Sequence, residues 1–240
     1  MEYARAKMNI TRNLLSGDLF LFSRNAGLYG GFPEIFDSLQ KNHVVCEEVD
    51  LPSDSIGEIS NPSLSGQHNR LNLHFALRTV ETLSILMNRP LEREDYSAAF
   101  EEFQGLPHRL ENCGEVDGIL FINDSKATTI QAVLSALQSF SGEVHLLLGG
   151  RNKGLDFSIL RDRARLYPYG EAGPMIAGQV GLAQSHAGLR SAFAEAVRAA
   201  RAPAVILLSP GCSSFDEFRS YADRGETFRK LVDELRREKI

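Results

Sequence analysis

Apolar residues recur at two different spacings along this sequence, and the spacing changes near residues 105–107. Before that point, short apolar runs at 19–23 and 44–51 predict strands, and a Ser/Pro/Asn-rich loop at 53–65 precedes a long helix. In this helix the apolar residues stand three and four positions apart, which predicts one buried stripe. The stripe consists of Leu73, Leu77, Val80, Leu83 and Met87.

After residue 107, short apolar runs alternate with segments of helical periodicity. The runs that predict strands are 118–122, 144–148, 166–169 and 204–208. The segments that predict helices are 130–140, 157–165, 189–200 and 221–237. Because this alternation is typical of a mostly parallel sheet with helices on both faces, the sequence predicts an α/β fold.

Each predicted strand after residue 107 ends in a loop of small, polar or cationic residues. In an open parallel sheet the ligand crevice lies beyond the carboxyl ends of the strands, so these loops should meet at one edge. One polar loop of this kind is ordinary, but four in succession, two of them with a lysine, favour a binding site. The loops are 123–128, 149–154, 170–173 and 209–214.

Composition and charge narrow the possible functions. The chain has 240 residues, of which 43% are hydrophobic, and a net charge of −5 with a pI of about 5.7. An acidic protein is not expected to bind nucleic acids or anionic membranes in general. Cationic side chains nevertheless gather in the predicted loops and at the junction near 105–107, which favours a small polyanion such as a nucleotide phosphate or a dicarboxylate. They are His108, Arg109, Lys126, Arg151 and Lys153.

The cysteines indicate a reducing compartment. Cys46, Cys113 and Cys212 stand far apart without a Cys-X-X-Cys step, which argues against a zinc module and a disulfide framework. Cys212 lies amid the predicted loops, and we interpret it as a small packing residue. The first ten residues lack the apolar core of a signal peptide, and no apolar run approaches 18 residues. We therefore expect a soluble cytoplasmic protein.

Five segments match the motifs of one known family, in that family's order. They are Leu-Ser-Gly-Gln-His-Asn-Arg-Leu-Asn (64–72), Gly-Leu-Pro-His-Arg (105–109), Ile-Asn-Asp-Ser-Lys-Ala-Thr (122–128), Leu-Leu-Gly-Gly-Arg-Asn-Lys-Gly (147–154) and Leu-Ser-Pro-Gly-Cys-Ser-Ser-Phe-Asp-Glu-Phe (208–218). On these motifs the chain resembles the Mur ligases, and the segment 123–128 is similar to their D-glutamate-adding members. Near the start, Tyr-Ala-Arg-Ala-Lys (3–7) resembles the family segment whose lysine is carbamylated.

The resemblance implies a fold and a reaction. It implies that 1–105 is the C-terminal part of a central ATP-binding domain and that 106–240 is a Rossmann-like, glutamate-binding domain. The implied reaction is an ATP-dependent amide ligation of peptidoglycan biosynthesis, with ATP and Mg²⁺ as cofactors and an acyl phosphate as intermediate. UDP-N-acetylmuramoyl-L-alanine and D-glutamate are the implied substrates.

The resemblance also assigns residues to the nucleotide. It places Asn69, Asn72, Arg109 and Asp124 there, with His108 as a weaker candidate. From the residues alone other roles remain open for each. Asn69 and Asn72 could cap a helix, as could Asp124, while Arg109 could be a surface arginine and His108 a hinge residue.

Two lysines would act on the transferred phosphoryl group. We expect Lys126 beside the acyl phosphate, because a cation there offsets the charge of the phosphoryl oxygens. Lys7 would form the carbamate that helps to hold Mg²⁺, since an unmodified ammonium cannot bind that ion. Without the resemblance, Lys7 is simply a solvated lysine on an N-terminal helix.

The remaining assignments concern glutamate. The resemblance gives it Thr128, Lys153 and Ser214, with the backbone at Phe215 and the position of Tyr221. One charge and two hydroxyls suit the two carboxylates of glutamate. Tyr221 departs from the usual Phe of the family, and Thr129 stands where Asn is usual.

Part of the family's site is missing from the sequence. The phosphate-cradling segment GxxxxGK[ST] needs a Gly-Lys step, and none of the 20 glycines is followed by lysine. We therefore expect the chain to be inactive alone. The alternatives are a stand-alone module that binds glutamate or a nucleotide, a subunit that pairs with a separate N-terminal half, or a ligase similar to folylpolyglutamate synthetase. We also expect 106–240 to fold alone and 1–105 to be poorly ordered or to associate.

Overall fold

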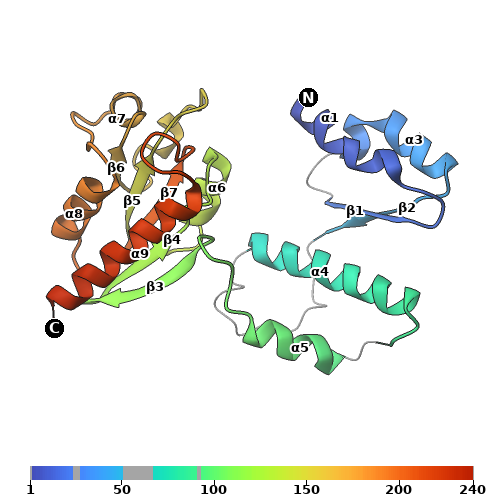
Figure 1. Ribbon diagram of the computed structural model, residues 1–240. Coiled ribbons are helices and arrows are strands. Elements are labelled where there is room, and N and C mark those ends of the chain that lie inside the picture. The colour runs from blue at the N-terminus through green and yellow to red at the C-terminus, as the bar shows by residue number, and fades with distance from the viewer. Residues whose placement is uncertain (1, 24–27, 51–66, 91–92, 240) are drawn as a thin grey trace. The chain divides into compact units, whose positions relative to one another are not determined.

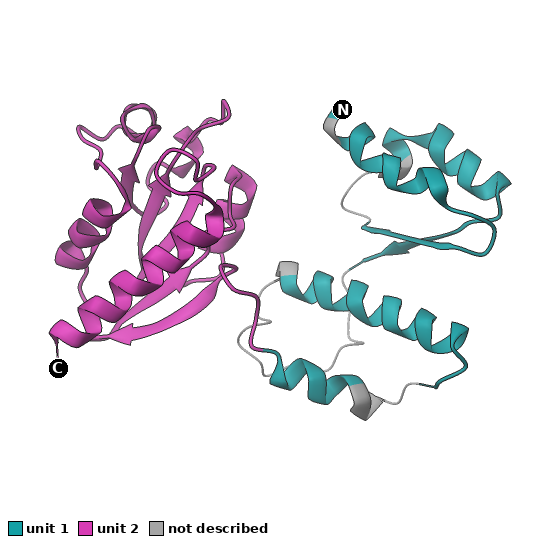
Figure 2. Cartoon of the chain, in the orientation of Figure 1, with its two compact units in different colours: residues 1–103 teal, residues 104–240 magenta. Residues whose placement is uncertain are grey.

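The computed structural model describes residues 2–23, 28–50, 67–90 and 93–239. The chain divides into two compact units, 1–103 and 104–240, which Figure 2 colours separately. The loop expected at 53–65 lies outside the described residues.

Unit 1 contains a small parallel sheet. Strand β1 (Leu19–Ser23) pairs with β2 (Val45–Val49), with Leu19 opposite Val45, so both strands predicted in this region are confirmed. Between them come the short helix α2 (Leu28–Gly31) and α3 (Pro33–Lys41), and α1 (Glu2–Met8) precedes the sheet. A small aromatic core packs these elements together, and it consists of Met8, Phe22, Phe32 and Phe36.

The long helix of unit 1 is only half covered by apolar neighbours. It is α4 (Gln67–Leu86), and α5 (Arg93–Glu102) follows it. Leu73 and Leu77 are buried, but the expectation of one buried stripe is wrong further along, where side chains are 42 to 63% exposed. A helix of this length extends about 30 Å, whereas a five-residue strand extends about 17 Å, so two short strands cover only part of it. The exposed residues are Val80, Leu83 and Met87.

Unit 2 is built on a five-stranded sheet with the strand order β3-β4-β7-β5-β6 (Figure 1). All neighbouring strands are parallel except the edge pair β3 and β4, so the predicted mostly parallel sheet is confirmed. The strand β3 was not predicted, because the sequence Glu-Asn-Cys-Gly-Glu-Val is largely polar and its pairing shifts register in the middle. The strands are β3 (Glu111–Val116), β4 (Ile119–Asn123), β5 (Glu143–Gly149), β6 (Arg165–Tyr169) and β7 (Ala204–Gly211).

Helices cover both faces of this sheet. Neighbouring strand residues alternate between two cores: Phe121 packs with α8 and α9, and Ile122 packs with α6 and α7. This alternation follows from the two-residue period of a strand, so β4, β5, β6 and β7 each contribute to both cores, whereas the edge strand β3 contributes to the first alone. The helices are α6 (Ile130–Leu137), α7 (Gly173–Val180), α8 (Leu189–Ala199) and α9 (Tyr221–Glu238).

The prediction of a helix at 157–165 is wrong. Only a short 3₁₀ helix forms there, at Ser158–Leu160, and β6 begins at Arg165. The carboxylate of Asp156 accepts hydrogen bonds from the backbone N and the hydroxyl of Ser158, a local arrangement that competes with an α-helix. Asp162 then adopts a positive φ of 62°, which ends any helical continuation.

Candidate functional site

The four loops that the sequence predicts at one edge meet at the carboxyl edge of the sheet in unit 2. Three of them, after β4, β5 and β7, carry the chosen site residues, and the fourth, after β6, joins the loop after β5 through a 2.9 Å hydrogen bond from the backbone N of Ala172 to the carbonyl of Gly150. The backbone N of Gly211 donates to the carbonyl of Ala127 at 2.9 Å, which joins the loops after β7 and β4. Arg151 and Ser213 exchange backbone hydrogen bonds of 2.9 and 3.2 Å, which joins the loops after β5 and β7. The predicted binding loops therefore form one connected edge.

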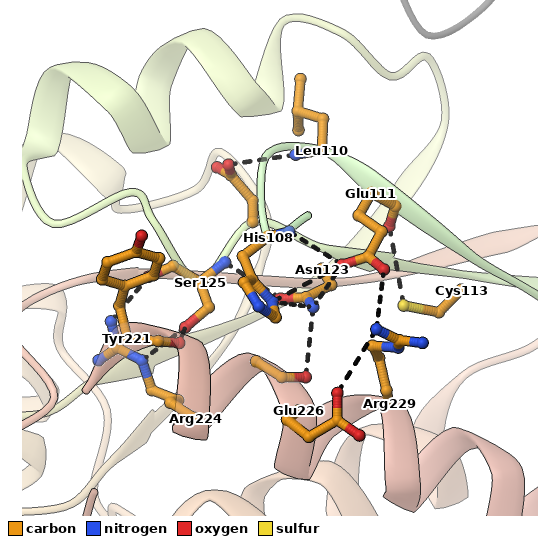
Figure 3. Close-up of polar contacts among 12 residues, drawn as sticks. His108, Leu110, Glu111, Cys113, Asn123, Ser125, Tyr221, Arg224, Glu226 and Arg229 are labelled. Atoms are coloured by element: carbon orange, nitrogen blue, oxygen red, sulfur yellow. Dashed lines mark hydrogen bonds and ion pairs between the residues drawn. The ribbon is translucent and has the colours of Figure 1, made fainter. Parts of the chain in front are cut away.

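A buried amide fixes His108 at this edge (Figure 3). The Nδ2 of Asn123 lies 3.0 Å from Nδ1 of His108 and donates to Glu111 Oε2 at 2.9 Å and to the carbonyl of Gly225 at 3.2 Å. The backbone N of His108 donates to the same Glu111 oxygen at 2.9 Å. Nδ1 of His108 also lies 3.6 Å from Glu111 Oε2, so the amide of Asn123 and the carboxylate of Glu111 together hold the ring in place.

The side chains of Lys126, Tyr221 and His108 come together. The Nζ of Lys126 lies 4.0 Å from the centre of the Tyr221 ring, within the range of a cation–π interaction. The His108 ring meets the same tyrosine edge-on, with 6.1 Å between ring centres. The backbone N of Lys126 also donates to the carbonyl of His108 at 3.0 Å. Three of the residues chosen from the sequence thus share one cluster.

Asp124 is buried beside this cluster. Its Oδ2 accepts a hydrogen bond of 2.9 Å from Ser209 Oγ, and its Oδ1 accepts one of 3.3 Å from the backbone N of Leu110. Burial raises the pKa of Asp124 to about 6, although these hydrogen bonds and the charge of Arg109 act in the opposite direction. A carboxylate held in this way is an acceptor whose charge is only partly compensated.

The alternative role of Asp124 as a helix cap is not what the structure shows. Helix α6 begins at Ile130, and its N-cap is Thr129, whose hydroxyl accepts a hydrogen bond of 3.3 Å from the backbone N of Ala132. Thr129, whose effect the sequence left undecided, is thus a capping residue.

The residues expected at glutamate occupy the three connected loops. Thr128 is half-buried after β4, Lys153 is exposed after β5, and Ser214 is buried after β7. Phe215 and Tyr221 are exposed beside them. Cys212 is buried, and burial raises the pKa of its thiol to about 12, so this cysteine is an inert packing residue as expected.

Sequence analysis missed Arg224, which is fully buried in the first turn of α9. Its Nε donates to Ser125 Oγ and its Nη2 to the Ser125 carbonyl, both at 2.9 Å. Both Nη atoms lie 3.2 Å from the carbonyl of Cys212, and Nη1 donates to the carbonyl of Gly149 at 3.4 Å. The pattern of a charged residue at the start of an amphipathic helix gave no sign of this, because such residues are usually exposed.

Asn123, Glu111 and Ser209 were also missed as supporting residues. Asn123 is fully buried and stands in the matched segment 122–128, so its place in that motif is the signal that could have found it.

The remaining candidates lie in unit 1. Lys7 is exposed on α1, and Asn72 is exposed and Asn69 half-buried on α4. Because α4 begins at Gln67, both asparagines lie inside the helix and neither is its N-cap. Their assignment to a nucleotide, and that of Lys7 to a metal, stay predictions.

The residues described here do not form a metal site by themselves. Within the described ranges no three His, Cys, Asp or Glu side chains are placed to hold a metal ion, and a carbamate on Lys7 would add a single carboxylate. Among the described helices, none is both long and apolar enough to cross a bilayer.

Curated relatives share sequence with nearly the whole chain. UDP-N-acetylmuramoylalanine–D-glutamate ligase from Salinibacter ruber is 33% identical over 97% of this chain and 55% of its own length, and that from Bacteroides fragilis is 35% identical over 98% and 57%. The enzyme of that name from Chlamydia caviae is 41% identical over 70% of this chain and 41% of its own length. The chain therefore spans about half the length of the curated relatives it matches. A comparison with models of known families found no match.

Solved structures share the fold. MurF from Acinetobacter baumannii aligns with a TM-score of 0.61 and 14% identity over 96% of this chain and 55% of its own. FolC from E. coli, in complex with DHPP and ADP, aligns with a TM-score of 0.63 and 15% identity over 95% of this chain and 57% of its own. A bifunctional folylpolyglutamate synthase/dihydrofolate synthase with Mn, AMPPNP and L-glutamate bound aligns with a TM-score of 0.55 and 15% identity over 83% of this chain and 51% of its own.

Proposed function

The chain belongs to the Mur ligase family, and we propose that it takes part in the ATP-dependent addition of D-glutamate to UDP-N-acetylmuramoyl-L-alanine in cytoplasmic peptidoglycan synthesis. The observation that carries this proposal is the cluster of Lys126, His108 and Tyr221 at the edge where the three loops meet. A cation beside an imidazole ring suits a phosphoryl group, and the curated relatives that match this chain are named D-glutamate ligases.

On the nucleotide side, each residue has a chemical task. Above pH 6 the carboxylate of Asp124 is an acceptor for ribose hydroxyls, while the guanidinium of Arg109 pairs with phosphate oxygens. His108, which lies in the same cluster as Lys126, is proposed to contact a further phosphate oxygen. Asn69 and Asn72 are also proposed to bind the nucleotide. ATP with Mg²⁺ is the proposed cofactor, in line with the AMPPNP and Mn found in a protein of the same fold.

In the proposed reaction the substrate carboxylate attacks the γ-phosphorus of ATP, so that ADP leaves and an acyl phosphate forms. The amine of D-glutamate then attacks the acyl carbon, phosphate leaves with the bonding electrons, and the amine loses a proton. Lys126 offsets the negative charge on the acyl phosphate in both steps.

The two carboxylates of glutamate are held by Lys153, Thr128 and Ser214, next to Phe215 and Tyr221, so that the amine of glutamate faces the acyl carbon. Lys7, as a carbamate, is the proposed further ligand of the divalent ion.

The length of the relatives bears on activity. Since the chain covers about half of each and contains no Gly-Lys step, we propose that ligation also needs residues beyond these 240. The alternatives of a stand-alone binding module or a split ligase share the binding step and differ only in what completes the site. The likeness to folylpolyglutamate synthases, at 12 to 17% identity, concerns the fold alone.

Calorimetric titration of the chain tests the glutamate site. We expect D-glutamate to bind at millimolar concentration more tightly than L-glutamate, and Lys153→Ala to weaken binding about tenfold, because a charge-assisted hydrogen bond to a carboxylate is lost. The exposed Lys230, on α9, supplies the control Lys230→Ala, which should bind as the wild type does. No heat with D-glutamate, or an equal loss in both variants, would contradict the proposed site. Ligation catalysed by residues 1–240 alone would contradict the requirement for further residues.

A further inference from the structure

The guanidinium of Arg224 joins three loops that are separate in sequence, and Figure 3 shows its contact with Ser125. It contacts the loop after β4 at Ser125, the loop after β5 at Gly149 and the loop after β7 at Cys212. The strands β4 and β5 are not neighbours in the sheet, because β7 lies between them. Arg224 therefore makes a connection between loops that direct strand pairing between β4 and β5 does not provide.

The charge of Arg224 is held by hydrogen bonds and not by a direct ion pair, and it acts at longer range on the carboxyl of Glu217. Among the residues that the structure describes, no carboxylate lies within ion-pair distance of its guanidinium, and all of its bonds go to carbonyls and one hydroxyl. Burying an unpaired charge is unfavourable, and the first turn of a helix disfavours a cation further. An apolar side chain of similar size would avoid both costs, so the presence of an arginine there calls for a reason beyond packing.

Each of the three loops carries a residue of the proposed site. Lys126 follows Ser125 directly, Lys153 stands four residues after Gly149, and Ser214 stands two residues after Cys212. We propose that Arg224 is the positioning residue that holds these three loops in the arrangement that binds glutamate and the acyl phosphate. This inference rests on the proposed function for its ligands, but the geometry of the loops is independent of it.

Only an arginine satisfies these three loops at once. Its planar guanidinium presents five N–H donors in a fixed fork, and the acceptors on Ser125, Gly149 and Cys212 surround it. A lysine keeps the charge but places three donors around a single nitrogen, so it cannot reach all three loops. The variant Arg224→Lys therefore separates the geometry of the fork from the charge.

Amide hydrogen exchange on the ligand-free chain tests the inference. In Arg224→Lys we expect the amides of Arg151, Ser213 and Gly211 to exchange at least tenfold faster, while core amides such as that of Leu146 keep their rates. The control Arg237→Lys changes an exposed arginine in the last turn of the same helix and should leave all rates unchanged. Unchanged loop exchange in a folded Arg224→Lys variant would overturn the inference.

A second measurement uses the wild-type chain and does not depend on how the variant folds. The Nε–H of Arg224 and the amides of Arg151 and Ser213 should exchange with one shared opening free energy, since they are released together. An Arg224 Nε–H that exchanges independently of these amides would overturn the inference.

Titration with D-glutamate separates this inference from the proposed function. If wild-type chain binds D-glutamate, Arg224→Lys should weaken binding at least tenfold, and unchanged affinity would overturn the positioning role. If the wild type does not bind, the proposed function fails, whereas the exchange results still decide whether Arg224 holds the loops.

Discussion

At the scale of single residues, Asp124 shows how a binding group reduces stability. Its carboxyl is buried, and two hydrogen bonds and the charge of Arg109 do not fully offset the loss of water, so its pKa rises to about 6. Above that pH the protein holds an ionised carboxylate that the unfolded chain would solvate better. Such a group is retained when its charge is used elsewhere, here as the proposed acceptor for ribose hydroxyls.

The variant Asp124→Asn should therefore stabilise the protein at neutral pH. Because the folded pKa lies above the unfolded value of 3.8, the stability contributed by the protonated carboxyl is full below pH 3.8 and is lost as pH rises through about 6. The shift corresponds to at most about 3 kcal/mol at pH 7.5, which the neutral amide would recover. Urea unfolding at pH 7.5 and at pH 4 measures the difference, which should nearly vanish at the lower pH.

The exposed carboxylate of Asp162 provides a matched control. Asp162→Asn should leave the unfolding free energy unchanged at both pH values. If Asp124→Asn also leaves the unfolding free energy unchanged at pH 7.5, the buried carboxylate does not reduce the stability of the protein. If the proposed function holds, Asp124→Asn should also bind ATP more weakly than the wild type at pH 7.5, since one acceptor of the ribose hydroxyls becomes a donor.

At the scale of elements, helix α9 contains a glycine that is required by close packing against another segment of the chain. Gly225 is buried in the second turn, and a Cβ at this position would overlap Nδ1 of His108. His108 in turn is fixed by Asn123 and Glu111. The missing side chain of Gly225 thus makes room for the ring that takes part in the proposed site.

Replacement of this glycine should reverse the usual effect of alanine in a helix. Gly→Ala in a helix interior ordinarily stabilises by about 0.5–1 kcal/mol, and Gly178→Ala in α7, where a Cβ meets nothing within 4 Å, should do so. Gly225→Ala should instead destabilise by about 1–3 kcal/mol, because the ring of His108 must move. Thermal unfolding of both variants checks this, and the double variant Gly225→Ala/His108→Ala should recover much of the loss. An equal stabilisation by both alanines would contradict the packing described for His108.

The same elements show what the sequence could and could not predict. The strands β4, β5, β6 and β7 were predicted because buried parallel strands are short apolar runs that stand out by composition. Helix α7 (Gly173–Val180) was missed because it is rich in glycine and alanine and has little polar face. A helix was wrongly predicted at 157–165 because the local hydrogen bonds of Asp156 override the periodicity of that region.

At the site, Lys126 and Asp124 could be chosen from their place after a strand. Arg224 could not, since only the folded chain brings Ser125, Gly149 and Cys212 around it.

At the scale of the whole molecule, the two units differ in how well their apolar surface is covered. Unit 2 has a core on each face of its sheet, and both cores consist of residues from unit 2. In unit 1 the buried cluster is small, and the second half of α4 exposes Val80 and Leu83, as does Met87 directly after it. Since apolar burial is the main source of folding free energy, most of the stability should reside in unit 2.

This difference predicts that residues 106–240 fold alone and that 1–105 do not form an equally stable structure. We expect 106–240, expressed separately, to unfold cooperatively at a temperature within a few degrees of that of the same segment in the full chain. Separate 1–105 should exchange its amides fast or associate through the exposed face of α4, because uncovered apolar surface favours self-association. Hydrogen exchange on the full chain gives the comparison directly. Equal protection in both parts would show that the buried area in unit 1 is sufficient, and that the exposed stripe on α4 costs less than its area suggests.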